Sequence, residues 1–150
     1  MELSADPFYN RFQIKHTVLE LLISIMQEIT LNDHTTQNTV VSAHLNDIQN
    51  AICFIHEHLS ESISLDDIAH AVNISRASLS SNFKKINGIS PYEYLLIKRI
   101  EKSLTLLKNT DISILSIAQE SGFSNLSNFN RIFKKINGMT PKDYRKSITR

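Results

Sequence analysis

An internal repeat is the feature that most restricts what this chain can fold into. The hexapeptide Phe83-Lys-Lys-Ile-Asn-Gly88 recurs as Phe133-Lys-Lys-Ile-Asn-Gly138, at an offset of 50 residues. Two copies of this length are too few for a solenoid and instead predict one domain with two similar lobes. The flanking matches are Ser90-Pro91 with Thr140-Pro141 and Tyr94 with Tyr144 at the same offset, then Ile68-Ala69 with Ile117-Ala118 and Ser75 with Ser124 at an offset of 49, so the second copy holds one extra residue.

The first copy has the pattern of a helix, a turn and a second helix. Ser64 can cap the first helix, with Asp67 three residues later as the reciprocal acid. Ser75 can cap the second helix, and Asn87-Gly88 can end it, because glycine readily adopts the left-handed conformation that follows many helices. Apolar residues at helical spacing support both helices, namely Leu65, Ile68, Ala69 and Val72 in the first and Leu79, Phe83 and Ile86 in the second.

The second copy repeats this pattern. Gly122-Phe123-Ser124 separates its two helices, and Asn137-Gly138 ends the second. The inward-facing positions are Ile114, Ile117, Ala118 and Ser121, then Phe129, Ile132, Phe133 and Ile136.

A longer helix is expected between the copies. Ser90-Pro91-Tyr92-Glu93 is a capping box with proline at the first helical position. The apolar stripe of Ile97, Ile100, Leu104 and Leu107 predicts a helix to about Lys108, which would span roughly 27 Å. Such a linker helix can hold two small lobes apart. A matching final helix starts at Thr140-Pro141-Lys142-Asp143.

The part before the repeats divides into three segments. Residues 46–59 are expected to form a helix with Ile48, Ile52 and Ile55 inward, residues 31–45 a polar linker, and residues 6–29 an amphipathic helix. The predicted organisation is therefore all-α: an amphipathic helix in 1–30, a linker in 31–45, and two helix-turn-helix subdomains joined by a long linker helix in 46–150.

Composition favours a helical protein, and its charge is unevenly distributed. Glycine and proline number three each, which is few for a sheet protein with many turns, and the single cysteine, Cys53, excludes a disulfide within the chain. We expect Cys53 to be a buried or half-buried thiol. Residues 1–45 carry a net charge of −3 and residues 46–150 a net charge of +4, which favours a phosphate-facing surface in the second part.

A helix-turn-helix presents its second helix to the major groove of DNA. This requires a capped start near phosphate and small polar side chains around an apolar inner face, and both copies meet the requirement. Serine and asparagine can bond phosphates or base edges, arginine can bond guanine, and lysines can meet phosphates. The candidate DNA-contacting residues are Arg76, Ala77, Ser78, Ser80 and Ser81 in the first copy, and Asn125, Leu126, Ser127, Asn128, Asn130, Arg131, Lys134 and Lys135 in the second. Asn82 and the pair Lys84 and Lys85 share this polar setting.

The chain resembles the C-terminal domain of AraC/XylS-type transcription regulators over about residues 46–147. The matching residues are Ile117-Ala118, Gly122-Phe123-Ser124, Phe129, Arg131, Phe133-Lys134-Lys135, Gly138, Thr140-Pro141 and Tyr144-Arg145, with Arg99 and Ile100 in the connecting helix. The resemblance implies that the second helix of each copy enters a major groove. It places the base-reading positions on Ala77, Ser80 and Ser81, and on Leu126, Ser127, Asn130 and Arg131.

Two of these positions depart from the family pattern. The family often has arginine where this chain has Ser81, and Leu126 is apolar. The departures favour the second copy as the main source of specific contacts. The first copy then either reads bases weakly or contacts the methyl group of thymine through Ala77.

Two other functions are alternatives to DNA binding. DNA-repair enzymes that carry such a domain use several clustered cysteines, and this chain has one; the other alternative is a protein-interaction module with degenerate helix-turn-helix units. No catalytic site, metal or cofactor is expected. The basic residues of the last helix, Lys142, Arg145 and Lys146, are either solvated surface or phosphate contacts.

The expected N-terminal helix has an apolar stripe that is wider than a coiled-coil seam, so this face is expected to pack against a partner. Its two rows are Phe8, Phe12, Leu19, Leu22, Met26 and Ile29, and Ile14, Val18, Leu21 and Ile25. We expect residues 6–30 to form a homodimer; the alternative is folding back on residues 46–60. Glu20, Ser24, Gln27 and Glu28 argue against a membrane span. The expectation is a cytoplasmic activator of transcription that binds double-stranded DNA, with RNA polymerase as a further candidate partner.

Overall fold

The structure is a computed structural model that describes residues 21, 25 and 39–148. Within residues 39–148 the fold is entirely helical, as predicted, and no strand occurs in that range. The helices are α2 (Thr39–Glu57), α3 (Leu65–Ala71), α4 (Arg76–Asn87), α5 (Pro91–Asn109), α6 (Ile114–Glu120), α7 (Leu126–Asn137) and α8 (Pro141–Ile148).

The predicted helix boundaries of the repeats follow from their caps. Ser64 and Asp67 form a reciprocal capping box at the start of α3, and Ser90 and Glu93 form another at the start of α5. The hydroxyl of Ser75 accepts from the backbone N–H of Ser78 at 3.1 Å and so starts α4. Gly88 and Gly138 end α4 and α7 in the left-handed conformation.

Two separate hydrophobic cores define two lobes. The first core lies among α2, α3, α4 and the beginning of α5, and the second lies among the rest of α5, α6, α7 and α8. The first core consists of Ile48, Ala51, Ile55, Ile68, Ala69, Leu79, Phe83, Ile89, Tyr94, Leu95 and Ile97. The second core consists of Ile100, Leu107, Ile117, Ala118, Phe123, Phe129, Ile132, Phe133 and Tyr144.

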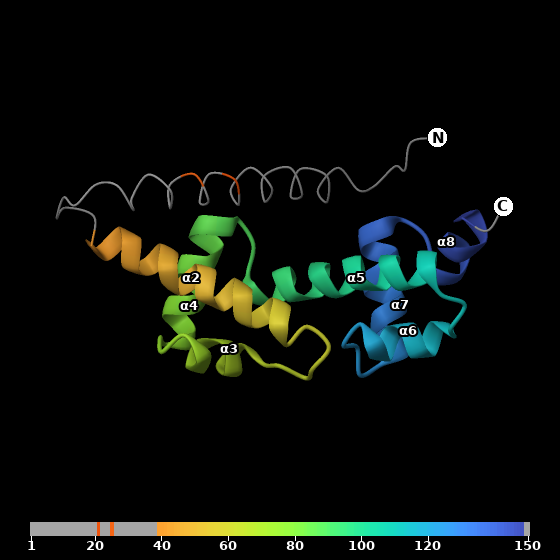
Figure 1. The fold of residues 1–150 in the computed structure, drawn as a ribbon, viewed down its shortest axis with the longest axis horizontal. Coiled ribbons are helices and arrows are strands. Elements are labelled where there is room, and N and C mark those ends of the chain that lie inside the picture. Colours follow the sequence, from red (N-terminus) through yellow and green to blue (C-terminus); the bar gives the residue numbers. More distant parts are fainter. Residues whose placement is uncertain (1–20, 22–24, 26–38, 149–150) are drawn as a thin grey trace.

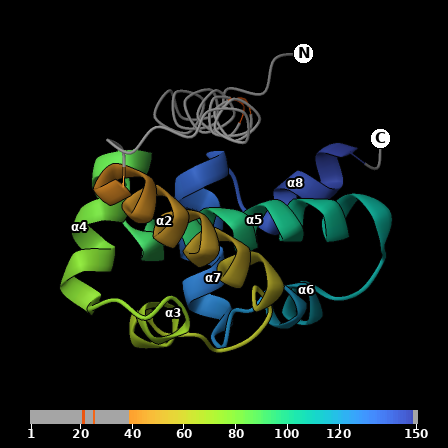
Figure 2. The same cartoon turned by 60° about the vertical axis from the view of Figure 1, so that its left-hand side comes forward.

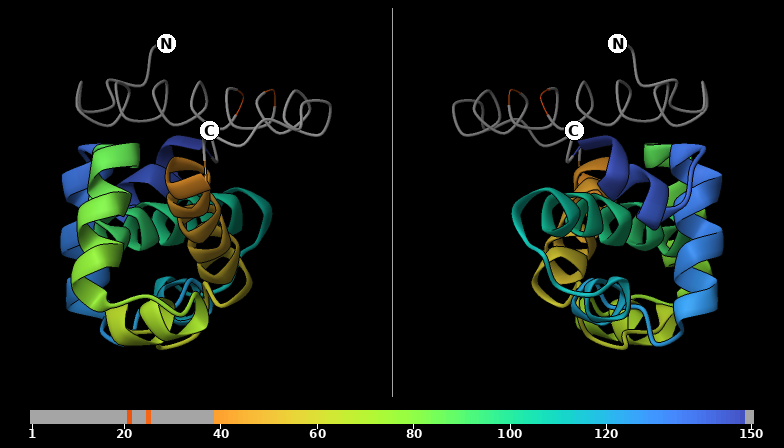
Figure 3. Two further views of the ribbon diagram at one scale, coloured as in Figure 1. Left: turned by 90° about the vertical axis from the view of Figure 1, so that its left-hand side faces the viewer. Right: turned by 90° about the vertical axis from the view of Figure 1, so that its right-hand side faces the viewer.

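Equivalent helices of the two lobes pack in equivalent ways, because α3 and α4 pack on α2 as α6 and α7 pack on α5. In Figure 1, α5 runs horizontally from the first lobe through the second, α4 and α7 run roughly vertically, and α3 and α6 lie along the lower edge. Figure 2 shows α2 crossing in front of α5. Figure 3 shows that α4 and α7 share one side of the molecule, whereas α2 lies on the other side. The second helix of each helix-turn-helix unit therefore belongs to a common face.

The N-terminal part differs from the expected boundaries at one point. The helix expected over 46–59 begins at Thr39 and ends at Glu57, so the expected polar linker over 31–45 was wrong for residues 39–45. In the sequence, Val41 and Leu45 stand seven and three residues before Ile48 and extend its stripe, a pattern masked by the polar residues around them. Residues 31–38 and nearly all of the expected 6–29 helix lie outside the described residues; Leu21 and Ile25 are helical and exposed.

The expected burial of Cys53 was also wrong, because its side chain is exposed. Cys53 stands two residues from each of the buried Ala51 and Ile55, and two residues turn a helix by about 200°. The apolar residues next to Cys53 in the sequence therefore do not indicate whether its side of α2 is buried.

Candidate nucleic-acid interface

Helix α4 carries the candidate residues of the first lobe. Leu79 and Phe83 are completely buried and attach the helix to the first core. This leaves Arg76, Ala77 and Ser81 exposed, and Ser78 and Ser80 half-buried. The guanidinium of Arg76 lies 3.3 Å from a carboxylate oxygen of Asp66 on α3, so the first residue of α4 is held by an exposed ion pair.

Helix α7 carries the candidate residues of the second lobe. Asn125 caps it, since the side-chain oxygen of Asn125 accepts from the N–H groups of Ser127 at 2.8 Å and Asn128 at 3.1 Å. The cap is thus one residue later than Ser124, at an offset of 50 from Ser75, and the extra residue of the second copy lies in the turn. Phe129, Ile132 and Phe133 are buried in the second core.

The outward face of α7 is polar. The guanidinium of Arg131 is exposed and donates to the side-chain oxygen of Asn128 at 2.8 Å. Ser127 is exposed, while Asn130 is half-buried. Leu126 is half-buried and packs against the second core, so part of this apolar side chain is used for folding.

The two lysine pairs are exposed in the last turns of α4 and α7. Lys84 of the first lobe and Lys135 of the second both lie close enough to Glu93 to lower the pKa of its carboxyl, after the larger effects of the Ser90 hydrogen bonds. The C-terminal ends of the two helices therefore place cations from both lobes around the start of α5.

The turns preceding α4 and α7 have equivalent left-handed residues. Asn73 has φ of 56° and Gly122 has φ of 88°. Asparagine tolerates this conformation better than most residues. At Gly122 a side chain is also excluded by space, because a Cβ atom there would lie 2.7 Å from Nε of Arg99 and would also collide with the carbonyl oxygen of Leu59.

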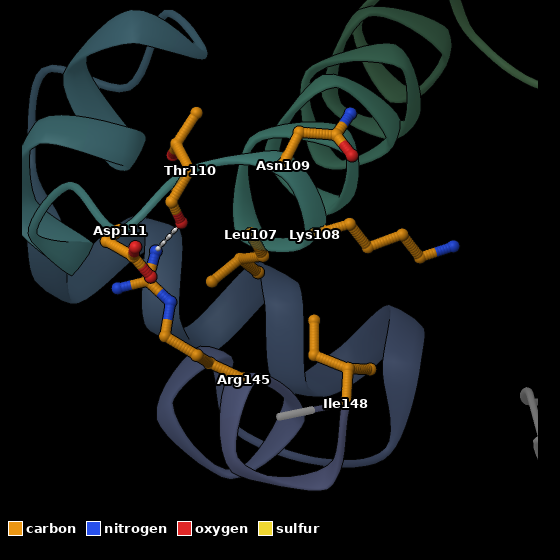
Figure 4. A pocket seen from close by; sticks show the side chains of 7 residues that line it. All are labelled: Leu107, Lys108, Asn109, Thr110, Asp111, Arg145 and Ile148. Carbon is orange, nitrogen blue, oxygen red and sulfur yellow. Dashed lines mark hydrogen bonds between the residues drawn. The ribbon is translucent and has the colours of Figure 1, made fainter. Parts of the chain in front are cut away.

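The sequence left open whether Arg145 is solvated surface or a phosphate contact. In the structure its side chain instead has a structural role. Its guanidinium donates to the carbonyl of Ile112 at 2.7 Å and to that of Thr110 at 3.4 Å, and so holds the loop between α5 and α6. Figure 4 shows Arg145 pointing toward this loop. The hollow beside it, of about 490 Å³, is lined by Leu107, Lys108, Asn109, Thr110, Asp111, Arg145 and Ile148. Apart from Arg145, none of these residues is a candidate DNA contact. Lys142 and Lys146 are exposed.

Arg99 is a buried cation whose contacts the sequence analysis did not predict. Only 7% of its surface is exposed, and burial lowers the pKa of its guanidinium. Its Nε donates to the carbonyl of Leu59 at 3.0 Å and its Nη2 to that of Glu61 at 2.5 Å. Its position between Ile97 and Ile100 of the apolar stripe was the signal in the sequence, because a cation beside a buried stripe needs fixed acceptors.

Across the described part of the chain, histidine, cysteine and acidic side chains form no group of three that could hold a metal ion. None of the helices described there has the length and apolar character needed to cross a bilayer.

The fold and the polar faces of α4 and α7 define a helix-turn-helix protein of the DNA-binding class. Residues 68–147 match the family described as "Helix-turn-helix domain". The chain is 33% identical over 129 residues to the Msm operon regulatory protein of Streptococcus mutans, an alignment that covers 86% of this chain and 45% of that relative. The chain spans less than half the length of the first curated relatives it matches.

Solved structures share the fold. A transcriptional regulator with an AraC-type DNA-binding domain from Chromobacterium violaceum is 29% identical with a TM-score of 0.65, covering 71% of this chain and 95% of that one. The DNA-binding domain of AdpA, solved in complex with a target DNA, shares the fold at 24% identity and a TM-score of 0.64, covering 67% and 90%. The chain belongs to the AraC/XylS family of DNA-binding transcription regulators, not to a family of enzymes.

Proposed function

We propose that this chain regulates transcription by inserting α4 and α7 into successive major grooves on one face of double-stranded DNA. The observation that carries the proposal is the common face of the two helices (Figure 3), combined with polar outer surfaces and buried apolar inner ones. A recognition helix must be fixed to its lobe by one side and free on the other, and both helices meet this condition.

In the second lobe, we assign base contacts to Leu126, Ser127, Asn130 and Arg131. Arg131 is the strongest candidate, because an exposed arginine can bond O6 and N7 of guanine at once. Its hydrogen bond to Asn128 limits the freedom of the guanidinium before DNA arrives, which reduces the entropy lost on binding. Asn125, Asn128, Lys134 and Lys135 are assigned to the DNA backbone near the two ends of α7.

In the first lobe, Ala77, Ser80 and Ser81 are assigned to base edges, and Arg76 and Ser78 to phosphates. The three side chains assigned to base edges are short. Discrimination between base pairs in this groove therefore depends on a close approach of α4 and on methyl contact with thymine by Ala77. Arg76 can contact a phosphate only if its ion pair with Asp66 is broken or shared. The carboxylate of Asp66 then lies near the DNA and repels the phosphates. Most of the specificity is therefore assigned to α7.

The two lobes differ in sequence, so one chain should recognise an asymmetric site of about 20 base pairs, two turns of the duplex. We place this activity in the cytoplasm, where bacterial DNA is transcribed. We further propose that the bound chain activates transcription through contact with RNA polymerase.

The test is selection of bound duplexes from a randomised pool, followed by measurement of affinity against salt. Each phosphate contact should contribute about −0.9 to the slope of log affinity against log salt concentration. We expect one enriched asymmetric sequence and a steep slope. A chain that enriches no duplex at low salt would contradict the proposal and favour a protein-interaction module with degenerate helix-turn-helix units.

A further inference from the structure

The linker helix alone does not fix how the two lobes are oriented. The first core uses α5 up to Ile97 and the second core uses α5 from Ile100 onward, so each lobe is attached to its own part of one helix. Long helices bend, and two bodies attached to one helix at different points can rock relative to each other. Contacts between the lobes are needed to prevent this motion.

Arg99 lies at the boundary between the two cores and contacts both lobes. On one side, its guanidinium donates to the carbonyls of Leu59 and Glu61, in the segment between α2 and α3. On the other side, it lies against Gly122 and 6.0 Å from the ring centroid of Phe123, in the turn of the second lobe. These five residues, Arg99, Leu59, Glu61, Gly122 and Phe123, are called the Arg99 joint below.

The joint acts close to the start of α7. Gly122 and Phe123 come just before Asn125, which caps this helix, and Gly122 packs directly against the carbonyl of Leu59 in the first lobe. At the other end of α7, Ile136 packs against both cores. Helix α7 is therefore connected to the first lobe near both of its ends, and two separated contacts restrict rotation as well as distance.

The chemistry of the joint suits positioning better than stabilisation. A buried guanidinium is desolvated, and apolar residues of similar volume often stabilise a protein equally well or better. The planar fork of arginine instead gives directional bonds to two carbonyls at once. Such a group fixes an angle between segments, which close-packed methyl groups specify less sharply.

We propose that Arg99 is a positioning residue that sets the spacing and orientation of the two recognition helices, and so makes the chain selective for one half-site spacing in DNA. The proposal rests on the function proposed above. One inserted base pair moves the second groove by about 3.4 Å and turns it by about 34°. A rigid pair of lobes cannot follow this change, whereas a loosened pair can.

Two substitutions separate positioning from stability. Arg99→Ala removes the guanidinium from the joint. Arg145→Ala is the matched control, because Arg145 also donates to two carbonyls, and both of these lie in the second lobe. Arg99→Lys retains the positive charge but lacks the planar guanidinium that bonds two carbonyls. It replaces Arg99→Ala as the test variant if Arg99→Ala fails to fold. Circular dichroism and thermal melting establish that each variant is folded.

The first measurement needs no DNA. Spin labels at His70→Cys and Glu120→Cys, both exposed and one in each lobe, report the distance between the lobes of one chain. The background carries Cys53→Ser and also Ile25→Asp, so that no distance between two chains of a dimer contributes. The parent chain and Arg145→Ala should give one narrow distance distribution. Arg99→Ala should give a broad one, with Arg99→Lys intermediate. A distribution for Arg99→Ala and Arg99→Lys as narrow as that of the parent would overturn the proposal.

The second measurement compares affinity for the selected duplex with affinity for the same duplex carrying one extra base pair between its half-sites. The parent chain and Arg145→Ala should lose affinity about a hundredfold on insertion, and Arg99→Ala less than about tenfold. An equal loss in all chains would refute a role of Arg99 in spacing. Failure of the parent to bind any duplex would contradict the proposed function instead, and the distance measurement would still decide whether Arg99 orients the lobes.

Discussion

Gly122 of the second lobe packs against the carbonyl of Leu59 in the first, with no room between them for a side chain. The Cβ of an alanine at position 122 would also lie 2.7 Å from Nε of Arg99, and φ at this position is +88°. A backbone contact thus joins segments more than 60 residues apart in the sequence. The contact lies just before the helix that we assign to the major groove.

This contact predicts that Gly122→Ala is strongly destabilising. The left-handed conformation alone should cost about 1–2 kcal/mol, and relieving the collision should bring the total to at least about 3 kcal/mol. Gly88→Ala is the control, because Gly88 has φ of +78° but nothing within 4 Å of an added Cβ. Urea denaturation should show the smaller loss for Gly88→Ala. Equal losses for the two variants would mean that the Leu59 contact carries no strain.

Arg131→Ala should weaken specific DNA binding without affecting the fold. The side chain is exposed, whereas its neighbours Phe129, Ile132 and Phe133 hold α7 in place. Loss of a guanine contact should cost about 1–3 kcal/mol and relax the preference at that base pair. Binding titrations with base-substituted duplexes and thermal melting measure the two effects. Normal binding, or loss of folding, would show that Arg131 has another role.

Glu93→Gln should reduce stability in a pH-dependent way. Hydrogen bonds from the backbone N–H and hydroxyl of Ser90, at 2.9 and 2.7 Å, lower the pKa of Glu93 from its ordinary value of 4.5. A carboxyl with a lowered pKa in the folded state stabilises it above pH 4.5, and this contribution is lost as the pH falls through the folded-state pKa.

The difference in unfolding free energy between the parent and Glu93→Gln should therefore be about 0.5–1 kcal/mol at pH 7, low in the range for helix caps because the carboxylate is exposed. It should shrink as the pH falls below 4.5. Glu120→Gln, at the exposed C-terminal end of α6, is the control and should show no such loss. A difference independent of pH would contradict the role of the charge.

Residues 6–30 should mediate a homodimer. Leu21 and Ile25 are helical and 58% and 50% exposed, and the sequence predicts two apolar rows on this segment. Sedimentation equilibrium at tens of micromolar should give a dimer for the parent chain and a monomer for Ile25→Asp. Leu115→Asp is the matched control, because Leu115 on α6 is also 50% exposed, and it should remain dimeric. A monomeric parent chain would favour folding back on residues 46–60.

The repeat made most of the local structure predictable. The caps Ser64, Ser75 and Ser90 and the left-handed Gly88 and Gly138 follow from short-range rules, since a cap bonds groups within three or four residues. The cap of α7 was harder to predict, because Ser124 and Asn125 are adjacent and both residue types can cap a helix. In the structure the cap is Asn125.

Long-range contacts were less predictable. The bonds of Arg99 to Leu59 and Glu61 join residues about 40 positions apart, and no periodicity along α5 reports which carbonyls face its side chain. The hydrogen bonds of Arg145 are also long-range, since Arg145 lies on α8 and its acceptors Ile112 and Thr110 lie in the loop between α5 and α6. The exposed face of α7 followed from sequence spacing, whereas the contacts that orient α7 relative to α4 required three-dimensional structure.

We infer that one chain places two recognition helices in successive major grooves of DNA. The direct test is hydroxyl-radical footprinting of the dimer-deficient Ile25→Asp variant on its selected duplex. We expect two protected regions on one face of the DNA, about 34 Å apart and unlike in sequence, within a site of about 20 base pairs. A single protected region of half a turn per chain would contradict the account.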